Sequence, residues 1–210
     1  MNKTFPFLVL LLVTKVAATQ TLNKLFLQLP DSCLLPAKES WCKPLDAAGR
    51  ATLLKNGTYD AYKLIAFDVQ NGYLSFLTAT DGPGYVVEMT YWKLKSGAKL
   101  VGLHIIAASP FARCTKQIFW LKYEDGKWTD LTRQYLPDLQ IENFYPPRKA
   151  PTDPQMRQMR WYFSLPRLGV NITIYPPEVD DVVPDSPPEA YYEMQWVNER
   201  FQLVRKLYEK

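Results

Sequence analysis

The chain has 210 residues, of which 47% are hydrophobic, 14% aromatic and 22% charged, and its formal charge is +4 at neutral pH. This composition is typical of a folded domain with a sizeable core, and one domain is expected at this length. Loss of Lys3 and Lys15 with the N-terminal segment described next lowers the charge to +2. So weak a charge argues against nucleic acid or an anionic membrane surface as the partner.

The first 18 residues have the pattern of a cleavable signal peptide. Lys3 precedes a short apolar run, and small residues up to Ala18 precede Thr19. The run is about half of the roughly 20 residues that a spanning helix requires, so an uncleaved anchor is the weaker alternative. We predict a signal peptide over residues 1–18 and a single α+β domain over residues 19–210, without a transmembrane segment in the mature chain. The expected location is the periplasm or the cell surface.

Three cysteines follow the predicted cleavage site. Export places them in an oxidising compartment, where disulfides persist. Cys33 and Cys42 are near neighbours, and closing so short a loop costs little chain entropy. They form the candidate disulfide, although sequence alone does not fix the connectivity. Cys114 is then left over and is interpreted as a small buried hydrophobe.

Two short helices are predicted near the N-terminus. Apolar residues recur at helical spacing between Leu22 and Leu29, directly before Pro30. A second helix is expected from Asp46, as the N-cap, to Lys55, closed by Asn56-Gly57. Both helices need a surface on which to bury an apolar face.

From Tyr59 onward, β-branched and aromatic runs alternate with turn pairs, which is typical of an antiparallel meander. In one predicted strand Glu88 and Thr90 mark a face expected to be wetter than the other. The strand from Lys99 to Ala107 is apolar on both faces and is predicted to be central. The predicted strands are Tyr62–Val69, Tyr73–Ala79, Tyr85–Leu94, Lys99–Ala107, Gln117–Tyr123, Trp128–Leu131, Met159–Leu165 and Val170–Tyr175.

Two proline-rich connections, at about 137–154 and 176–188, interrupt this pattern and are predicted to run over the surface as irregular chain. Residues 187–208 fit two structures. Apolar residues alternate on both sides of Asn198-Glu199, which favours a β-hairpin, whereas a helical spacing with a capping box at Ser186 is the alternative. The hairpin is the preferred prediction. The expected fold is thus α+β, with short N-terminal helices packed on an antiparallel β-sheet meander and a C-terminal β-hairpin.

His104 is the single histidine, and this limits the chemistry that the chain offers. Two-histidine zinc sites are excluded, and a serine or cysteine nucleophile that needs a histidine must use this one. His104 lies in the middle of an apolar predicted strand, whereas catalytic groups favour strand ends and loops. We therefore predict that its ring fills space and hydrogen-bonds to a neighbour.

Carboxylates offer the remaining route to catalysis, because a glycosidase-type mechanism needs one neutral and one ionised acid. Asp60, Asp68, Glu88 and Glu124 are the candidates, and their local sequence is that of solvated surface. No phosphate loop, nucleophile elbow or paired C-x-x-C motif is present, and no cofactor or metal is expected. Basic and aromatic residues alternate over residues 157–163, which we interpret as one exposed basic side of a strand.

Four short stretches follow one another along the chain: Phe26-Leu27-Gln28-Leu29-Pro30-Asp31-Ser32, Tyr73-Leu74-Ser75, Val87-Glu88-Met89, and Cys114 shortly before Ile118-Phe119-Trp120. In this order and spacing they resemble a family of exported Bacteroidetes proteins of unknown function. The resemblance covers about residues 21–131 and extends more loosely to the C-terminus, while the hairpin from Glu124 to Trp128 departs from the pattern. It implies a periplasmic or cell-surface setting and no particular activity.

Taken together, these features predict an exported, non-catalytic binding or envelope-associated module. Its partner is expected to be an envelope protein or a glycan, without a preference for either and without an indication of oligomeric state. A carboxylate-based envelope hydrolase is the alternative. A deep pocket in which two carboxylates converge and one has a raised pKa is the feature that separates the two.

Overall fold

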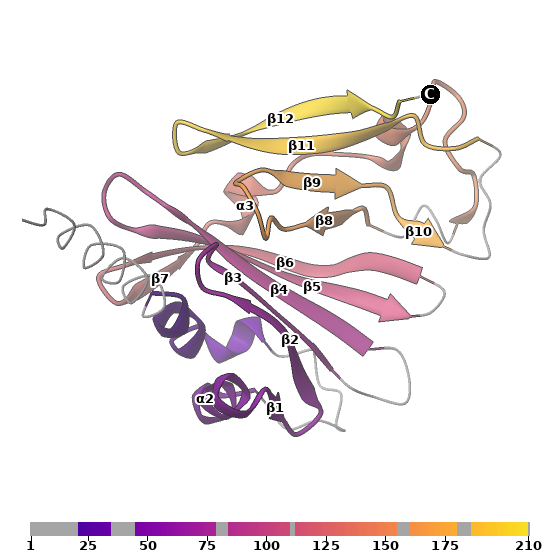
Figure 1. Ribbon diagram of the computed structural model, residues 1–210. Coiled ribbons are helices and arrows are strands. Elements are labelled where there is room, and N and C mark those ends of the chain that lie inside the picture. The colour runs from indigo at the N-terminus through magenta and orange to yellow at the C-terminus, as the bar shows by residue number, and fades with distance from the viewer. Residues whose placement is uncertain are drawn as a thin grey trace, which may run out of the picture.

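A computed structural model describes residues 21–34, 45–78, 84–109, 112–154, 160–179 and 186–209. The described chain forms two antiparallel sheets, with the N-terminal helices on the outer face of the larger one (Figure 1). This confirms the predicted α+β class. The predicted meander is divided, however, because its last strands form a separate sheet that covers the other face of the first.

The first sheet contains the meander predicted from Tyr59 onward, in the order β1-β2-β3-β4-β5-β6-β10 with β7 paired to β6. Turn chemistry sets its hairpins. Gly72, between β2 and β3, has a φ of 69°, and Asp125 and Gly126, between β6 and β7, have φ values of 50° and 81°, as tight hairpin turns require. Its strands are β1 (Thr58–Tyr59), β2 (Tyr62–Asp68), β3 (Tyr73–Thr78), β4 (Gly84–Lys93), β5 (Lys99–Ser109), β6 (Ala112–Glu124), β7 (Lys127–Asp130) and β10 (Glu178–Val179).

The predicted central strand is confirmed in β5, which pairs with β4 along one side and with β6 along the other. Every residue from Leu100 to Ile106 is buried. A strand buried on both faces needs a continuous apolar run rather than an alternation, which is what the sequence supplies here.

Both predicted helices are present, at residues 21–27 and in α2 (Ala47–Asn56), with a 3-10 turn, η1 (Asp31–Cys33), between them. The Asp46 side chain accepts a hydrogen bond from the Gly49 amide at 2.8 Å, as an N-cap does, and Gly57 closes α2 with a φ of 77°. The apolar face of the first helix, including Leu22 and Phe26, packs under the first sheet in one continuous core.

The second sheet has the order β12-β11-β9-β8, from β8 (Tyr162–Ser164), β9 (Ile172–Tyr175), β11 (Ala190–Val197) and β12 (Arg200–Leu207). The C-terminal hairpin prediction is confirmed, and the helical alternative is wrong. Asn198 and Glu199 both have positive φ, at 49° and 63°, which is the geometry of a two-residue hairpin turn.

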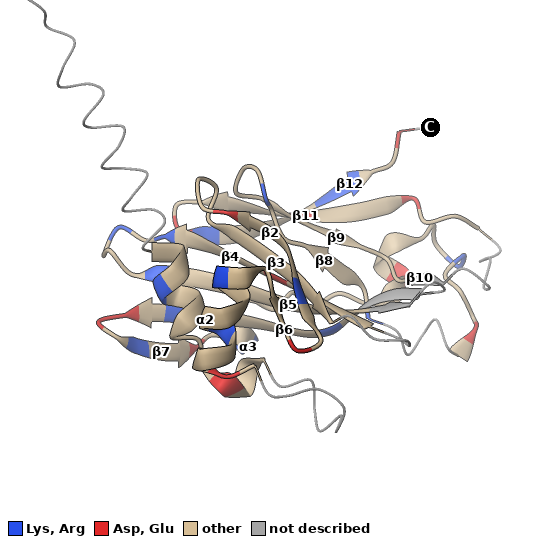
Figure 2. Ribbon diagram, turned by 60° about the horizontal axis from the view of Figure 1, so that its bottom comes forward, with Lys and Arg blue, Asp and Glu red and all other residues tan. Residues whose placement is uncertain are grey.

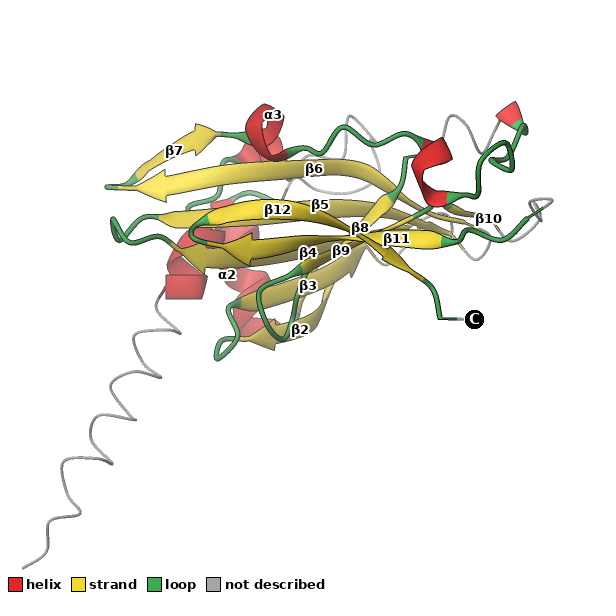
Figure 3. Cartoon of the chain, turned by 90° about the horizontal axis from the view of Figure 1, so that it is seen from above, coloured by secondary structure: helices red, strands yellow, loops and turns green. Residues whose placement is uncertain are grey.

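The wetter face predicted for β4 is wrong, because the second sheet covers it. Viewed from above, the strands of the second sheet lie over β4 and β5 (Figure 3). Thr90 is buried at this interface, and Trp92, two residues further along the same face, is buried in the core between the sheets. That core also contains Leu100, Trp120, Phe144, Phe163, Leu165, Ile172, Ile174, Tyr192 and Met194. Glu88 and Thr90 therefore lie between the two sheets and not on a solvated face.

The described residues of both proline-rich connections include regular structure, which was not predicted. The first includes η2 (Ile141–Phe144), and Leu139, Phe144 and Tyr145 are buried in the core between the sheets. The second contributes β10, which pairs with the start of β6. Prolines limit regular hydrogen bonding, but the aromatic and leucine side chains between them determine burial. A short helix, α3 (Thr132–Tyr135), precedes the first connection.

Candidate functional site

A pocket of about 570 Å³ lies where the first helix meets two hairpin turns of the first sheet. The helix contributes Lys24, the turn between β4 and β5 contributes Ser96 and Lys99, and the end of β6 contributes Glu124 and Asp125. Lysines, arginines and acidic residues gather around the N-terminal helices and the β6–β7 hairpin (Figure 2). The pocket thus presents both signs of charge.

The charges of the pocket are held in place by their neighbours. The Lys24 Nζ atom lies 5.6 Å from the centre of the Tyr123 ring, within cation–π range. Lys99 donates to the Gly97 carbonyl, and burial, followed by the charge of Lys93, lowers its pKa. Lys122 donates to Glu124 at 2.6 Å and, as the main cause, holds the pKa of that carboxyl below its usual value. Glu124 is therefore an ionised group and not a proton donor at neutral pH.

The helical wall of the pocket is fixed through Gln28, directly after the helix. The Tyr123 hydroxyl donates to the Gln28 side-chain oxygen at 2.5 Å, and the Trp128 ring nitrogen donates to the Gln28 carbonyl at 2.8 Å. These two bonds join the helix to the β6–β7 hairpin. The helix therefore keeps a defined position relative to Glu124 and Asp125.

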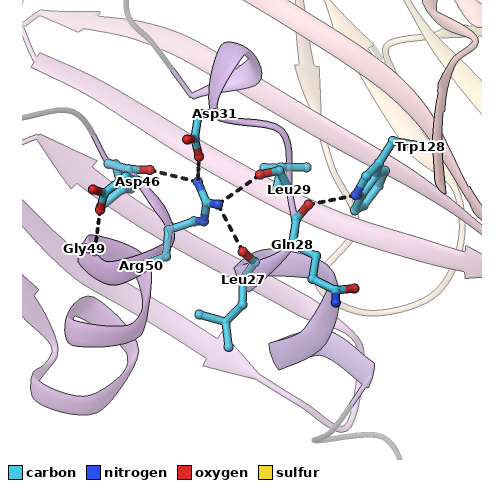
Figure 4. A network of polar contacts seen from close by, with 9 residues as sticks. Leu27, Gln28, Leu29, Asp31, Asp46, Gly49, Arg50 and Trp128 are labelled. Carbon is cyan, nitrogen blue, oxygen red and sulfur yellow. Dashed lines mark hydrogen bonds and ion pairs between the residues drawn. The ribbon is translucent and has the colours of Figure 1, made fainter. Parts of the chain in front are cut away.

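Arg50 of α2 fixes the same segment from its other side (Figure 4). Its guanidinium, 2% exposed, donates to the carbonyls of Leu27 and Leu29 at 3.0 Å each and to the carbonyl of Leu45 at 2.9 Å. It also forms an ion pair with Asp31 at 2.7 Å. One planar group thereby satisfies the carbonyls at the end of the first helix, which helix geometry leaves without partners.

A second polar group of residues is buried between the two sheets. The Tyr73 hydroxyl donates to Glu88 at 2.9 Å, and the His104 Nε2 atom lies 2.9 Å from the Thr115 hydroxyl. The other ring nitrogen of His104 is 3.8 Å from Glu88, and Phe163 of β8 packs edge-on against the ring. Burial, followed by the nearby Glu88 carboxylate, raises the pKa of Tyr73 far above its usual value. The prediction that His104 fills space and bonds to a neighbour is confirmed.

This environment makes a prediction about pH. Burial lowers the pKa of His104, against the smaller opposing effect of Glu88, so the unfolded chain binds a proton that the folded protein excludes. The contribution of the neutral His104 ring to the free energy of unfolding is fully present above the pKa of histidine in the unfolded chain, about 6.5. As the pH falls below this value, the free energy of unfolding decreases by up to about 1.4 kcal/mol per pH unit. Urea unfolding between about pH 7 and pH 5 should show this loss in the natural protein and a shallower loss in His104→Gln. Equal pH slopes would mean that the ring is protonated in the folded state.

The other residues singled out in the sequence are dispersed. Asp60 lies in the turn between β1 and β2, and Asp68 is held by Asn71 and Arg167, which lower its pKa in that order. Cys33 is buried, and burial raises the pKa of its thiol.

Part of the remaining sequence predictions cannot be placed. Cys42 and the Cys114 side chain lie outside the described part of the chain, so the Cys33–Cys42 disulfide stays a prediction. Within the basic and aromatic run, residues 157–159 also lie outside it, while Arg160 is exposed as expected and Phe163 is buried.

Among the charged residues of the pocket, Glu124 is one of the carboxylates singled out in the sequence, whereas the lysines are not. Lys24 and Lys99 carry no motif and come from segments far apart in the chain. Arg50 lies three residues before the buried Leu53 on α2, and a lone arginine on the apolar face of a helix was a signal that it has buried partners.

The described helices include none long and apolar enough to cross a membrane. In comparisons with known proteins, no protein family matches the chain by sequence, and no curated protein does. A solved structure, described as a domain of an uncharacterised protein from Porphyromonas gingivalis W83, is similar with a TM-score of 0.52 and 16% identity, over 88% of this chain and 97% of that one. The source belongs to the Bacteroidetes, to which the sequence resemblance also points, and an identity this low shows a shared fold alone.

Proposed function

We propose that the protein is an exported, non-catalytic binding module of the bacterial envelope, and that its pocket takes an acidic glycan fragment. The signal-peptide pattern of residues 1–18 supports export. The observation that carries the binding role is the pocket, which is of ligand size and contains Lys24 and Lys99 beside Glu124 and Asp125. Such a lining suits a hydrophilic ligand.

An acidic saccharide carries groups that pair with both signs of charge in this lining. Its carboxylate or sulfate accepts charge-assisted hydrogen bonds from lysine, and its hydroxyl groups donate to the two carboxylates. The hydroxyl of Ser96 adds a donor and an acceptor in the same lining. The turns that present these groups belong to a paired sheet, so the site is preorganised and little ordering is required on binding.

The pocket gives the hydrolase alternative no support. Hydrolysis by paired carboxylates requires one acid that stays protonated, and Lys122 keeps Glu124 ionised. Glu88, whose side chain is 17% exposed, accepts from Tyr73 and faces His104 between the sheets. The two carboxylates of the pocket, Glu124 and Asp125, and the Glu88 carboxylate thus lie in different environments.

Binding of the purified protein to a panel of acidic and matched neutral oligosaccharides, measured by calorimetry, tests the proposal. We expect an acidic member to bind and the double variant Lys24→Gln with Lys99→Gln to weaken it by at least about tenfold, since hydrogen bonds to charged groups contribute about 1.5–3 kcal/mol each. Lys55→Gln, at an exposed position of α2, is the matched control and should bind normally. Equal affinity for neutral saccharides, or equal loss in the control, would contradict the proposal.

A further inference from the structure

We infer that the free edge of β12 accepts an extended peptide of alternating apolar and acidic residues as an added strand. β12 is the end strand of the second sheet and pairs with β11 alone among the described strands (Figure 1). Its eight residues keep an unbroken register with β11. An end strand presents unpaired backbone donors and acceptors along its outer side, which form a template for another strand.

This edge lacks two of the devices that keep end strands from pairing. Proteins shorten such strands or interrupt them with bulges, whereas β12 is as long as its partner β11 and has no register shift. Such a register shift does occur in the first sheet, where β5 and β6 are out of step between Ile105 and Ile106. A regular strand of this length can pair with a peptide over its whole length.

Exposed leucines add an apolar component to the edge. Leu203 and Leu207 are 43% and 62% exposed, and Leu136, after α3, is 41% exposed. Leu203 and Leu136 also line a groove of about 190 Å³ together with Tyr135 and Phe201. Leu203 and Leu207 project from the same face of β12, because side chains alternate along a strand. Apolar side chains on that face of an added strand therefore lie beside the two leucines and remove them from water.

The charge of β12 selects the polar residues of the partner. The strand carries Arg200, Arg205 and Lys206 and no acidic residue, and blue segments mark it in Figure 2. Arg205 and Lys206 contact Glu189 and Glu193 respectively, the latter at 3.7 Å, so part of the charge is already balanced. Arg200 and Lys206 lie on the face of β12 opposite to the two leucines, so the acidic side chains of an alternating strand come beside these two residues.

The same charges argue against a second copy of this chain as the partner. Antiparallel pairing of β12 about a two-fold axis places residues of the same face opposite one another. Three registers pair the middle of β12 with the middle of β12 in the second copy. In each of them, Arg205 lies opposite or diagonal to Arg205 of the second copy, or Arg200 lies opposite or diagonal to its Lys206. Like charges across strands are destabilising. A peptide from another protein, with acidic residues beside Arg200 and Lys206, avoids this repulsion.

Fluorescence anisotropy with labelled eight-residue peptides tests the inference. The purified protein should bind a peptide that alternates leucine with aspartate, and should bind the leucine–lysine counterpart at least about tenfold more weakly. A central proline, which removes a backbone donor, should abolish binding. Leu203→Asp should weaken binding, while Ile65→Asp, at an exposed position of β2, should leave it unchanged.

Three results would overturn the inference. The first is no binding of the leucine–aspartate peptide at millimolar concentration, and the second is equal binding of the lysine peptide. The third is a concentration-dependent dimer in sedimentation that Leu203→Asp removes, since a second copy is then the occupant of the edge. The acidic glycan of the pocket is absent from all these measurements, so their outcome is separate from that of the proposed function.

Discussion

Arg50→Met is expected to lower the free energy of unfolding by at least about 3 kcal/mol, because it leaves three carbonyls without their donor and each buried group left unpaired costs about 1–3 kcal/mol. These are the carbonyls of Leu27, Leu29 and Leu45. Methionine keeps most of the volume of the arginine stem, so the loss measures polar contacts rather than a cavity. In a domain of this size the melting temperature should fall by about 6–12 °C.

Two further variants show whether geometry or charge is responsible. Arg50→Lys keeps the charge, but one ammonium cannot span acceptors that a planar fork contacts from two nitrogens, so an intermediate loss is expected. Arg167→Met removes an ion pair with Asp68 in which the arginine side chain is 61% exposed, and it should cost less than about 1 kcal/mol. Urea unfolding of all three variants provides the comparison. A loss in Arg50→Met as small as that in Arg167→Met would mean that water replaces the guanidinium.

The same substitution should affect the pocket, because Arg50 holds the segment that follows the first helix. Lys24 is on this helix, and its distance from Lys99 depends on the helix staying docked. Limited proteolysis should therefore cut between residues 21 and 34 sooner in Arg50→Met than in Arg167→Met. Equal cutting would show that Gln28, bonded to Tyr123 and Trp128, suffices to hold the wall.

The parts of the fold that were predictable from sequence depend on neighbouring residues. Asp46 and Gly57 mark the ends of α2, and Asn198-Glu199 marks the turn of the C-terminal hairpin, because each acts on the backbone within a few residues. These signals gave the order of the elements. They carry no information about which strands share a sheet, since the choice is made by contacts across the chain.

The errors arose where distant segments meet. The alternation of β4 predicts that Glu88 faces solvent. In the structure the chain around β8 covers it, and the Leu165 amide, 77 residues later, lies 3.5 Å from its carboxylate. The same segment places Phe163 against His104, the neighbour of Glu88. The pocket has the same origin, because its charges come from the first helix and from two turns of the sheet. A polar residue in an apolar strand can face solvent or can be buried with a hydrogen-bond partner. Which of the two holds depends on whether a distant segment of the chain supplies that partner.

Gly102→Val is expected to lower the free energy of unfolding by up to about 3 kcal/mol through overpacking. Gly102 lies at the middle of β5, under the contact between the sheets. A Cβ atom at this position would lie 3.0 Å from the Trp120 ring and 3.2 Å from the Trp92 ring, and the two further methyl groups of valine need still more room. Both rings are buried, so they cannot turn away into solvent.

The effect should extend into the second sheet, because the two tryptophans belong to the core between the sheets. The ring of Trp92 lies 5.1 Å from that of Phe201 and 5.9 Å from that of Trp196, centre to centre. Displacing Trp92 therefore moves the turn end of the β11–β12 hairpin. Near-ultraviolet circular dichroism of the aromatic cluster should change in Gly102→Val even in the absence of denaturant.

Lys93→Val is the control, since it places the same side chain at an exposed position of the neighbouring strand β4. It should leave both the unfolding free energy and the aromatic spectrum nearly unchanged, because valine suits a strand and meets no ring there. If Gly102→Val unfolded like the control, the tryptophans would have room to move, and the contact between the sheets would be looser than the 5.6 Å separation of the Trp92 and Trp120 rings indicates. A large loss with an unchanged aromatic spectrum would instead place the strain in the β5 backbone.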